Sequence, residues 1–172
     1  MMRVIGLDPG LRYTGWGIIE LDGQLLRFID AGCVESNPKD DLAVRLEQLH
    51  SALIKITKNF KPDEAAIEET FVNRNPASAL KLGQARGAIL LVPALFSIPV
   101  SEYAATTVKK SVTGSGHADK VKVRSMVNLL LRGVGQLKFD ASDALAIAIC
   151  HSHFSKSNSK LSVISENLKA AG

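Results

Sequence analysis

Four carboxylates, each beside an apolar segment, are the residues of this chain that could carry metal-dependent chemistry: Asp8, Glu68, Asp140 and Asp143. The first two end apolar runs, and the last two precede a third run at 144–149. A carboxylate at the edge of a buried element is costly unless it is capped, paired or bound to a metal. Because these acids are distributed over three separate elements, they could converge on a single divalent-cation site.

The chemistry that such a site favours is phosphodiester hydrolysis. Carboxylate oxygens without a cysteine or an obligatory histidine suit Mg²⁺ or Mn²⁺ better than Zn²⁺. Two such ions, roughly 3.5–4 Å apart, activate a water and stabilise the leaving oxygen of an in-line displacement. The acids therefore predict a two-metal site that uses Mg²⁺ and accepts Mn²⁺ in its place.

Each acid also has an ordinary structural interpretation. Asp8 precedes Pro9-Gly10 and could hydrogen-bond a turn. Glu68 is followed by Glu69, and strand alternation sends the two side chains to opposite faces, so the spacing leaves the choice between them open. Asp140 could cap a helix with Asp143 at its third position, an arrangement that the helix dipole favours without catalysis.

Length and composition indicate one globular α/β domain. The 172 residues suffice for one full core. The longest apolar stretch, 88–96, is broken by Pro93 and is too short to span a bilayer. The N-terminus lacks the pattern of a signal peptide, and two cysteines form no disulfide framework. We expect a cytoplasmic protein with no membrane segment, a domain over 1–154 and a flexible tail over 155–172.

Positive charge is concentrated in one stretch of the chain. Residues 103–139 contain seven basic side chains and one acidic one, within a chain whose net charge is +4. A clustered basic stretch is typical of a protein that binds nucleic acid. A solvated helix-and-loop face is the alternative interpretation.

The pattern of apolar residues and breakers predicts a mixed sheet with helices on both faces. Strands are expected over 3–7, 15–20, 25–34, 65–68 and 98–102. Helices are expected over 41–58, 75–91, 104–112, 119–131 and 140–153, with the second ending before Pro93. Strands alternating with helices in this way define the layered α/β class.

Five segments follow one another along residues 3 to 153: GLDPGLRYTGWG (6–17), AIEETF (66–71), NPASALKLGQARG (75–87), EYAA (102–105) and DASDALAIA (140–148). Together they closely resemble the RuvC family of bacterial Holliday-junction resolvases. The resemblance implies a ribonuclease-H-like fold with a mixed five-stranded sheet. It also implies a homodimeric, metal-dependent endodeoxyribonuclease that nicks two opposing strands of a four-way DNA junction symmetrically. Such an enzyme acts in homologous recombination and DNA repair, and the resemblance implies a branch-migration helicase complex as its partner.

The resemblance also assigns roles to individual residues. The family's catalytic and metal-binding acids fall on the four carboxylates, which selects Glu68 over Glu69. Some members carry His where Asp140 stands, so Asp140 is expected to support the other three. The aromatic residue that contacts the junction corresponds to Phe71, and the lysines that contact DNA correspond to Lys109 and Lys120. The helix at 76–91 corresponds to the dimer element; its apolar residues alone do not distinguish a core helix from an interface helix.

Three rival interpretations share parts of this pattern. A non-junction nuclease of the same superfamily would keep the acids but lack Phe71 and the loop flanked by Lys109 and Lys120. An ATPase of the sugar-kinase or actin type also has an Asp-x-Gly phosphate loop, but it needs two such domains. The third is a junction-binding module without catalysis.

Overall fold

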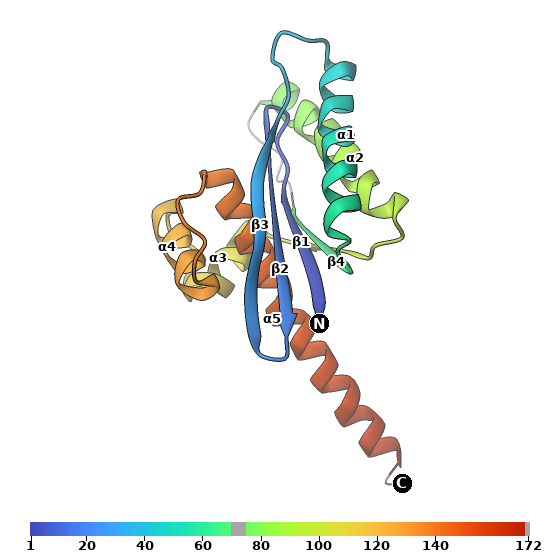
Figure 1. Cartoon of the computed structure of the whole chain (residues 1–172), viewed down its shortest axis with the longest axis vertical. Coiled ribbons are helices and arrows are strands. Elements are labelled where there is room, and N and C mark those ends of the chain that lie inside the picture. Colours follow the sequence, from blue (N-terminus) through green and yellow to red (C-terminus); the bar gives the residue numbers. More distant parts are fainter. Residues whose placement is uncertain (70–74, 171–172) are drawn as a thin grey trace.

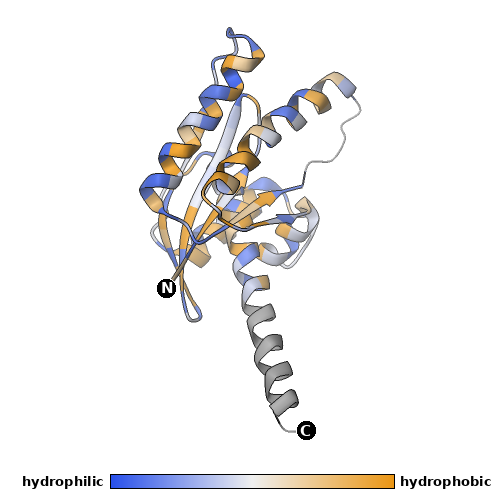
Figure 2. Cartoon of the chain, turned by 90° about the vertical axis from the view of Figure 1, so that its right-hand side faces the viewer, coloured by the Kyte–Doolittle hydropathy of each residue, from blue (hydrophilic) through white to orange (hydrophobic). Residues whose placement is uncertain are grey.

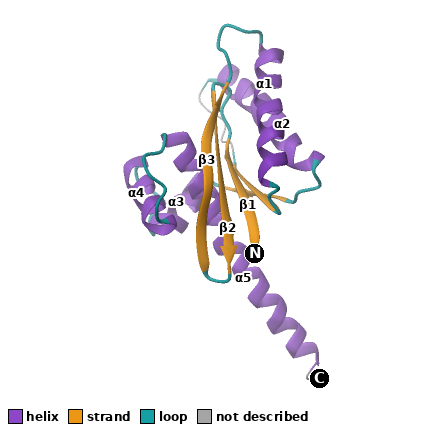
Figure 3. Ribbon diagram, in the orientation of Figure 1, coloured by secondary structure: helices purple, strands orange, loops and turns teal. Residues whose placement is uncertain are grey.

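The protein was analysed as a computed structural model that describes residues 1–69 and 75–170, with side chains through Ser155. Phe71 falls outside the described residues. In the described ranges, five strands form one mixed sheet in the order β3-β2-β1-β4-β5. Figures 1 and 3 show β3, β2 and β1 side by side. Their bounds are Met2–Asp8 for β1, Tyr13–Asp22 for β2, Leu25–Glu35 for β3, Glu64–Glu68 for β4 and Val100–Tyr103 for β5. The predicted mixed sheet is confirmed.

The sheet has an antiparallel half and a parallel half. β1, β2 and β3 form a meander closed by the turn at Gly23, whose φ of 58° suits glycine. β4 pairs with β1 and β5 pairs with β4, both in parallel, so the carboxyl ends of these three strands lie at the same edge. Asp8 and Glu68 are the last residues of β1 and β4 and therefore lie at that edge.

In the part of the chain that the structure describes, five helices cover the two faces of the sheet: α1 (Leu42–Phe60), α2 (Pro76–Leu95), α3 (Ala105–Thr113), α4 (Lys120–Leu131) and α5 (Phe139–Ala170). α1 and α2 pack on one face, where Leu53 and Ile89 join strand residues such as Ile67 in one apolar cluster. α3, α4 and α5 cover the other face around a second cluster (Figure 1). Apolar residues concentrate on the strands and alternate with polar ones along α1 (Figure 2). Among the described helices, none has the length and apolar character needed to cross a membrane.

α2 begins as the sequence predicts and ends later. The side chain of Asn75 accepts hydrogen bonds from the backbone N–H groups of Ala77 and Ser78, which confirms the predicted cap. The expected end before Pro93 is wrong, because the helix continues to Leu95. Proline removes only one hydrogen-bond donor so close to the helix end, and the buried Pro93 carbonyl accepts from Ile98 N–H at 2.9 Å.

α5 differs from its predicted bounds at both ends. It begins at Phe139, so Asp140 lies inside the first turn and the prediction that it is the N-cap is wrong. The helix also continues past His153 to Ala170, and its last part extends away from the sheet (Figure 1). The division into a domain over 1–154 and a separate tail stays a prediction.

Glycines on the two central strands allow α5 to approach the sheet closely. A Cβ atom at Gly6 of β1 would lie 2.0 Å from the carbonyl oxygen of Ala144, and one at Gly15 of β2 would lie 2.0 Å from that of Asp140. Neither backbone contact could be relieved by rotating a side chain. The glycines therefore bring the first turns of α5 against the ends of β1 and β2, beside Asp8.

Candidate active site

Three of the four predicted acids line one cleft at the carboxyl edge of the parallel strands. Asp8 comes from β1, Glu68 from β4 and Asp143 from α5, and the cleft has a volume of about 180 Å³. Lys109 of α3 and Lys120 at the start of α4 line the same cleft. The fold thus brings together five residues that are spread over 136 positions of the sequence (8 to 143).

Strand alternation aims two of these acids at the same helix. Leu7 and Ile67 belong to the apolar cluster on the α1 and α2 face of the sheet. Their successors Asp8 and Glu68 therefore turn to the opposite face, which α5 covers. Glu69 lies beyond the end of β4, and its N–H donates to the carbonyl of Tyr103 at 2.9 Å. The cleft is lined by Glu68 and not by Glu69, in agreement with the choice that the family resemblance makes.

The loop that follows Asp8 is held by hydroxyl groups. The Thr14 hydroxyl donates to the carbonyl of Gly10 at 2.8 Å, and the Ser36 hydroxyl donates to the carbonyl of Leu11 at 2.5 Å. Arg45 of α1 in turn donates to the Ser36 hydroxyl oxygen at 3.1 Å. These bonds close the turn without the Asp8 carboxylate, which leaves that group available to the cleft.

The cleft makes negative charge costly, and the carboxyl pKa values show it. Burial, and after it the neighbouring negative charges of Asp143 and Glu68, raise the pKa of Asp8 to about 7. The pKa of Glu68 is also raised, first by burial and then by Asp143, while Lys109 and Lys120 oppose the rise. The site therefore favours any cation that neutralises the acids.

A lysine supplies part of that positive charge. The ammonium Nζ of Lys120 donates to Oδ2 of Asp143 at 3.0 Å. This bond is the main reason that the pKa of Lys120 is raised. Lys120 is largely exposed, so the ammonium can exchange the carboxylate for another anion at low cost.

The three carboxylates suit a hard divalent cation, although in this structure their side chains are not close enough to hold one ion together. All three acids offer oxygen ligands, which Mg²⁺ and Mn²⁺ prefer. Within the described ranges, however, no three acidic, histidine or cysteine side chains are close enough to hold an ion as they stand. Mutual repulsion and the bond from Lys120 to Asp143 both oppose a tighter cluster.

Asp140, unlike the other three acids, is not among the residues that line the cleft. Its backbone carbonyl is packed against Gly15 of β2, and its charge raises the pKa of Cys33 on β3. Of the four neighbouring charges that shift the pKa of Asp8, that of Asp140 has the smallest effect. Asp140 therefore lies toward the antiparallel half of the sheet, outside the set of residues that line the cleft.

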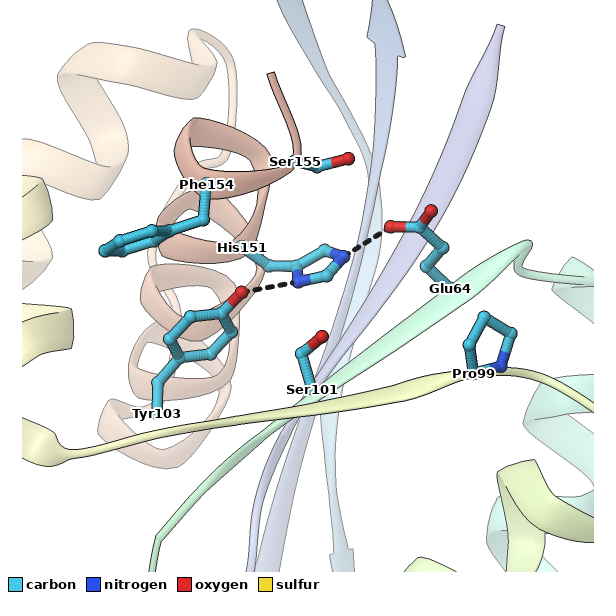
Figure 4. A pocket seen from close by; sticks show the side chains of 7 residues that line it. All are labelled: Glu64, Pro99, Ser101, Tyr103, His151, Phe154 and Ser155. Atoms are coloured by element: carbon cyan, nitrogen blue, oxygen red, sulfur yellow. Dashed lines mark hydrogen bonds and ion pairs between the residues drawn. The ribbon is translucent and has the colours of Figure 1, made fainter. Parts of the chain in front are cut away.

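The structure shows a second polar cluster that sequence reasoning missed. The Tyr103 hydroxyl is hydrogen-bonded to Nδ1 of His151 at 2.9 Å, and Nε2 of that ring lies 2.5 Å from a carboxylate oxygen of Glu64. Figure 4 shows the three side chains in a separate pocket of about 280 Å³ between α5, β4 and β5. They fasten α5 to the parallel strands. Their wide separation in the sequence gives no signal of this contact.

The sheet order, the helices on both faces and the acids at the carboxyl edge are typical of nucleases with the ribonuclease-H-like fold. Comparison with known proteins is more specific. The family model described as "Crossover junction endodeoxyribonuclease RuvC" matches residues 4–151. The chain belongs to the RuvC family of crossover junction endodeoxyribonucleases, which confirms the resemblance seen in the sequence.

Relatives and solved structures agree on this membership. The RuvC protein of Paramagnetospirillum magneticum is 55% identical over 160 residues, which cover 93% of this chain and 96% of the relative. That of Rhizobium johnstonii is 54% identical over 157 residues, covering 91% and 93%. The structure of Thermus thermophilus RuvC in complex with a Holliday junction substrate matches with a TM-score of 0.84 and 30% identity, covering 92% of this chain and 97% of that one. The yeast mitochondrial Holliday junction resolvase Ydc2, at 12% identity and a TM-score of 0.64, shares the fold.

Proposed function

We propose that this chain is a metal-dependent endodeoxyribonuclease that resolves four-way DNA junctions by paired symmetric nicks, in homologous recombination and DNA repair. The observation that carries the proposal is the cleft that unites Asp8, Glu68 and Asp143 with two lysines. Family membership supports four-way DNA junctions as the substrate, because the chain is 55% identical to a crossover junction endodeoxyribonuclease over nearly its whole length.

The acids would act as ligands of two divalent cations. Asp8, Glu68 and Asp143, which line the cleft, would hold the two ions, with Asp140 in support. Mg²⁺ would be the ordinary ion and Mn²⁺ a substitute, and when bound the pair would activate water and stabilise the leaving oxygen. Binding would also relieve the repulsion that raises the pKa values of Asp8 and Glu68.

The lysines and one aromatic residue would hold the DNA. Lys120 can exchange its bond to Asp143 for a phosphate oxygen, which would free that carboxylate for a cation. Lys109 lies beside Glu68 and would contact a second phosphate. Phe71 would stack on an unpaired base at the crossover; it lies outside the described residues, and this role is carried from the family.

Symmetric cutting of two strands calls for two sites related by a two-fold axis, and α2 offers a surface for such a dimer. Leu80, Leu91 and Leu95 are 65%, 51% and 59% exposed. Gly83 and Gly87 share this face by helical spacing, and a Cβ at either would meet no atom of the described residues within 4 Å. We propose that two copies pack through this face.

Two further proposals follow from the family. A branch-migration helicase complex would be a partner of this protein, and the cytoplasm would be its location.

The test is cleavage of a synthetic four-way junction by the purified protein. In chelator the protein should bind the junction without cutting, and with Mg²⁺ it should nick two opposing strands at symmetric positions. Asp8→Asn should abolish nicking and preserve binding. Equal cleavage of linear duplex would contradict the junction assignment, and binding without nicking at any Mg²⁺ concentration would favour a module without catalysis.

A further inference from the structure

We propose that Arg86 is a positioning residue that holds the Glu68 main chain from the face of the sheet opposite the cleft. The proposal rests on the proposed function, in which Glu68 is a metal ligand. Nε of Arg86 donates to the carbonyl oxygen of Glu68 at 3.4 Å, and Nη2 forms an ion pair with the carboxylate of Glu102. One guanidinium of α2 thus joins the ends of β4 and β5.

Glu68 needs such support because it extends beyond the pairing of β4 with β1. The last pair between these strands is Leu7 with Ile67, one residue before Glu68. On the other side, Glu68 is paired with Tyr103 of β5, and the next residue donates its N–H to the Tyr103 carbonyl. The position of Glu68 therefore depends on β5 and on Arg86, which fastens β5 to the same point.

Arg86 acts on the backbone and not on the carboxylate. Ile67 packs on the face that α2 covers, so the Glu68 side chain points away from Arg86 and toward α5. The charges that shift the pKa of that carboxyl are those of Asp143, Lys109 and Lys120. The effect of Arg86 on metal binding should accordingly depend on the geometry of its guanidinium group and not on its charge alone.

The arginine fork makes this contact hard to replace. A guanidinium presents several N–H donors in fixed directions, whereas an ammonium is a compact charge on a flexible stem. The Arg86 side chain is only 18% exposed, which strengthens its charge-assisted bond to Glu102. Lysine at this position would keep the charge but could not hold the β4 carbonyl and the β5 carboxylate in the same geometry.

The location of Arg86 also connects two parts of the proposed mechanism. Arg86 lies between Gly83 and Gly87 on α2, the helix that carries the exposed apolar face proposed for dimerisation. The same helix would then pair two copies and fix one metal ligand in each.

The test compares Arg86→Lys and Arg86→Gln with wild type, using Arg27→Lys and Arg27→Gln as matched controls. Arg27 forms an exposed ion pair with Asp22 at 3.5 Å in the β2–β3 hairpin, which lies beside the start of β1, whereas the cleft lies at the end of β1. The measurements are Mn²⁺ affinity by calorimetry, the Mg²⁺ dependence of single-turnover junction cleavage, and junction affinity in chelator. Substitution of residues that orient metal ligands typically weakens metal affinity or activity about 10–100-fold.

We expect both Arg86 variants to lose about tenfold in Mn²⁺ affinity and to require correspondingly more Mg²⁺ for cleavage. Junction affinity in chelator and dimer mass should stay at the wild-type values, and the Arg27 variants should match wild type throughout. Glu102→Gln, which keeps Arg86 and removes its anchor, should shift the metal requirement in the same direction by a smaller factor and serves if an Arg86 variant fails to fold.

Restoration of wild-type metal affinity by Arg86→Lys would overturn the proposal, because charge alone would then suffice. A loss of junction affinity in chelator without a change in Mn²⁺ affinity would also overturn it and would make Arg86 a DNA contact. If the wild-type protein fails to cut junctions, the proposed function fails, while the Mn²⁺ affinities of the variants still decide the role of Arg86.

Discussion

Replacing Asp8 by asparagine should stabilise the metal-free protein at neutral and mildly alkaline pH. The folded state raises the pKa of Asp8 from its ordinary value of 3.8 to about 7. Above pH 7 the folded protein holds a costly buried charge, whereas the unfolded chain holds the same charge in water. As the pH falls through 7, Asp8 takes up a proton in the folded state and the cost declines, until it vanishes below the unfolded pKa.

The size of this effect follows from the shift. A difference of about three pKa units corresponds to a cost of about 4 kcal/mol in the free energy of unfolding above pH 7. We expect Asp8→Asn to recover about half of this limit, about 2 kcal/mol, because a buried amide also loses contacts with water. For a chain of this size that gain raises Tm by about 4–8 °C.

The assay is thermal unfolding at pH 5 and pH 8, with chelator or Mg²⁺. In chelator the variant should exceed wild type at pH 8 and approach it at pH 5. Mg²⁺ should stabilise wild type, by about 2.7 kcal/mol at a hundred times the dissociation constant, and should have little effect on the variant. Asp41→Asn is the control, since Asp41 is exposed at the start of α1 and its side chain makes no cap hydrogen bond. A variant no more stable than wild type at pH 8 in chelator, or equally stabilised by Mg²⁺, would refute the reasoning.

Three further predictions concern packing, DNA contact and assembly. Gly15→Ala should lower the free energy of unfolding by about 1–3 kcal/mol in chemical denaturation, because its Cβ would lie 2.0 Å from a carbonyl oxygen of α5; an unchanged value would contradict the close packing. Lys120→Met should reduce the slope of log junction affinity against log salt by about 0.9, the value for one lost phosphate contact; an unaltered slope would exclude that contact. Leu80→Glu should yield monomers in sedimentation, whereas Leu25→Glu, at a similar 63% exposure in the β2–β3 hairpin, should not; dimers in both would contradict the α2 interface.

The sequence predicts the order of elements well because apolar periodicity and turn residues are local signals. The cap at Asn75 and the hairpin at Gly23 are cases in which the residue type determines the backbone. Helix ends are less predictable, since packing supplies what the local sequence lacks. Pro93 stays inside α2 at the helix terminus, and α5 begins one residue before Asp140.

The candidate site was only partly accessible to sequence reasoning. The four acids stand out by their neighbours, but the choice of Glu68 over Glu69 depends on which face of β4 meets α5, and the spacing left it open. The displacement of Asp140 toward β2 follows from the glycine contacts of α5, which no local pattern encodes. No sequence pattern indicates the contacts of Arg86, because its partners Glu102 and Glu68 lie 16 and 18 residues away and come close to it only in the folded sheet.

The central claim is that Asp8, Glu68 and Asp143 together hold the divalent cations that cut DNA. A crystal structure with Mn²⁺, with anomalous scattering used to locate the ions, tests it most directly. We expect two Mn²⁺ ions in the cleft, roughly 3.5–4 Å apart, held by Asp8, Glu68 and Asp143. Ions bound elsewhere, or ions in the cleft that Asp8 does not contact, would contradict it.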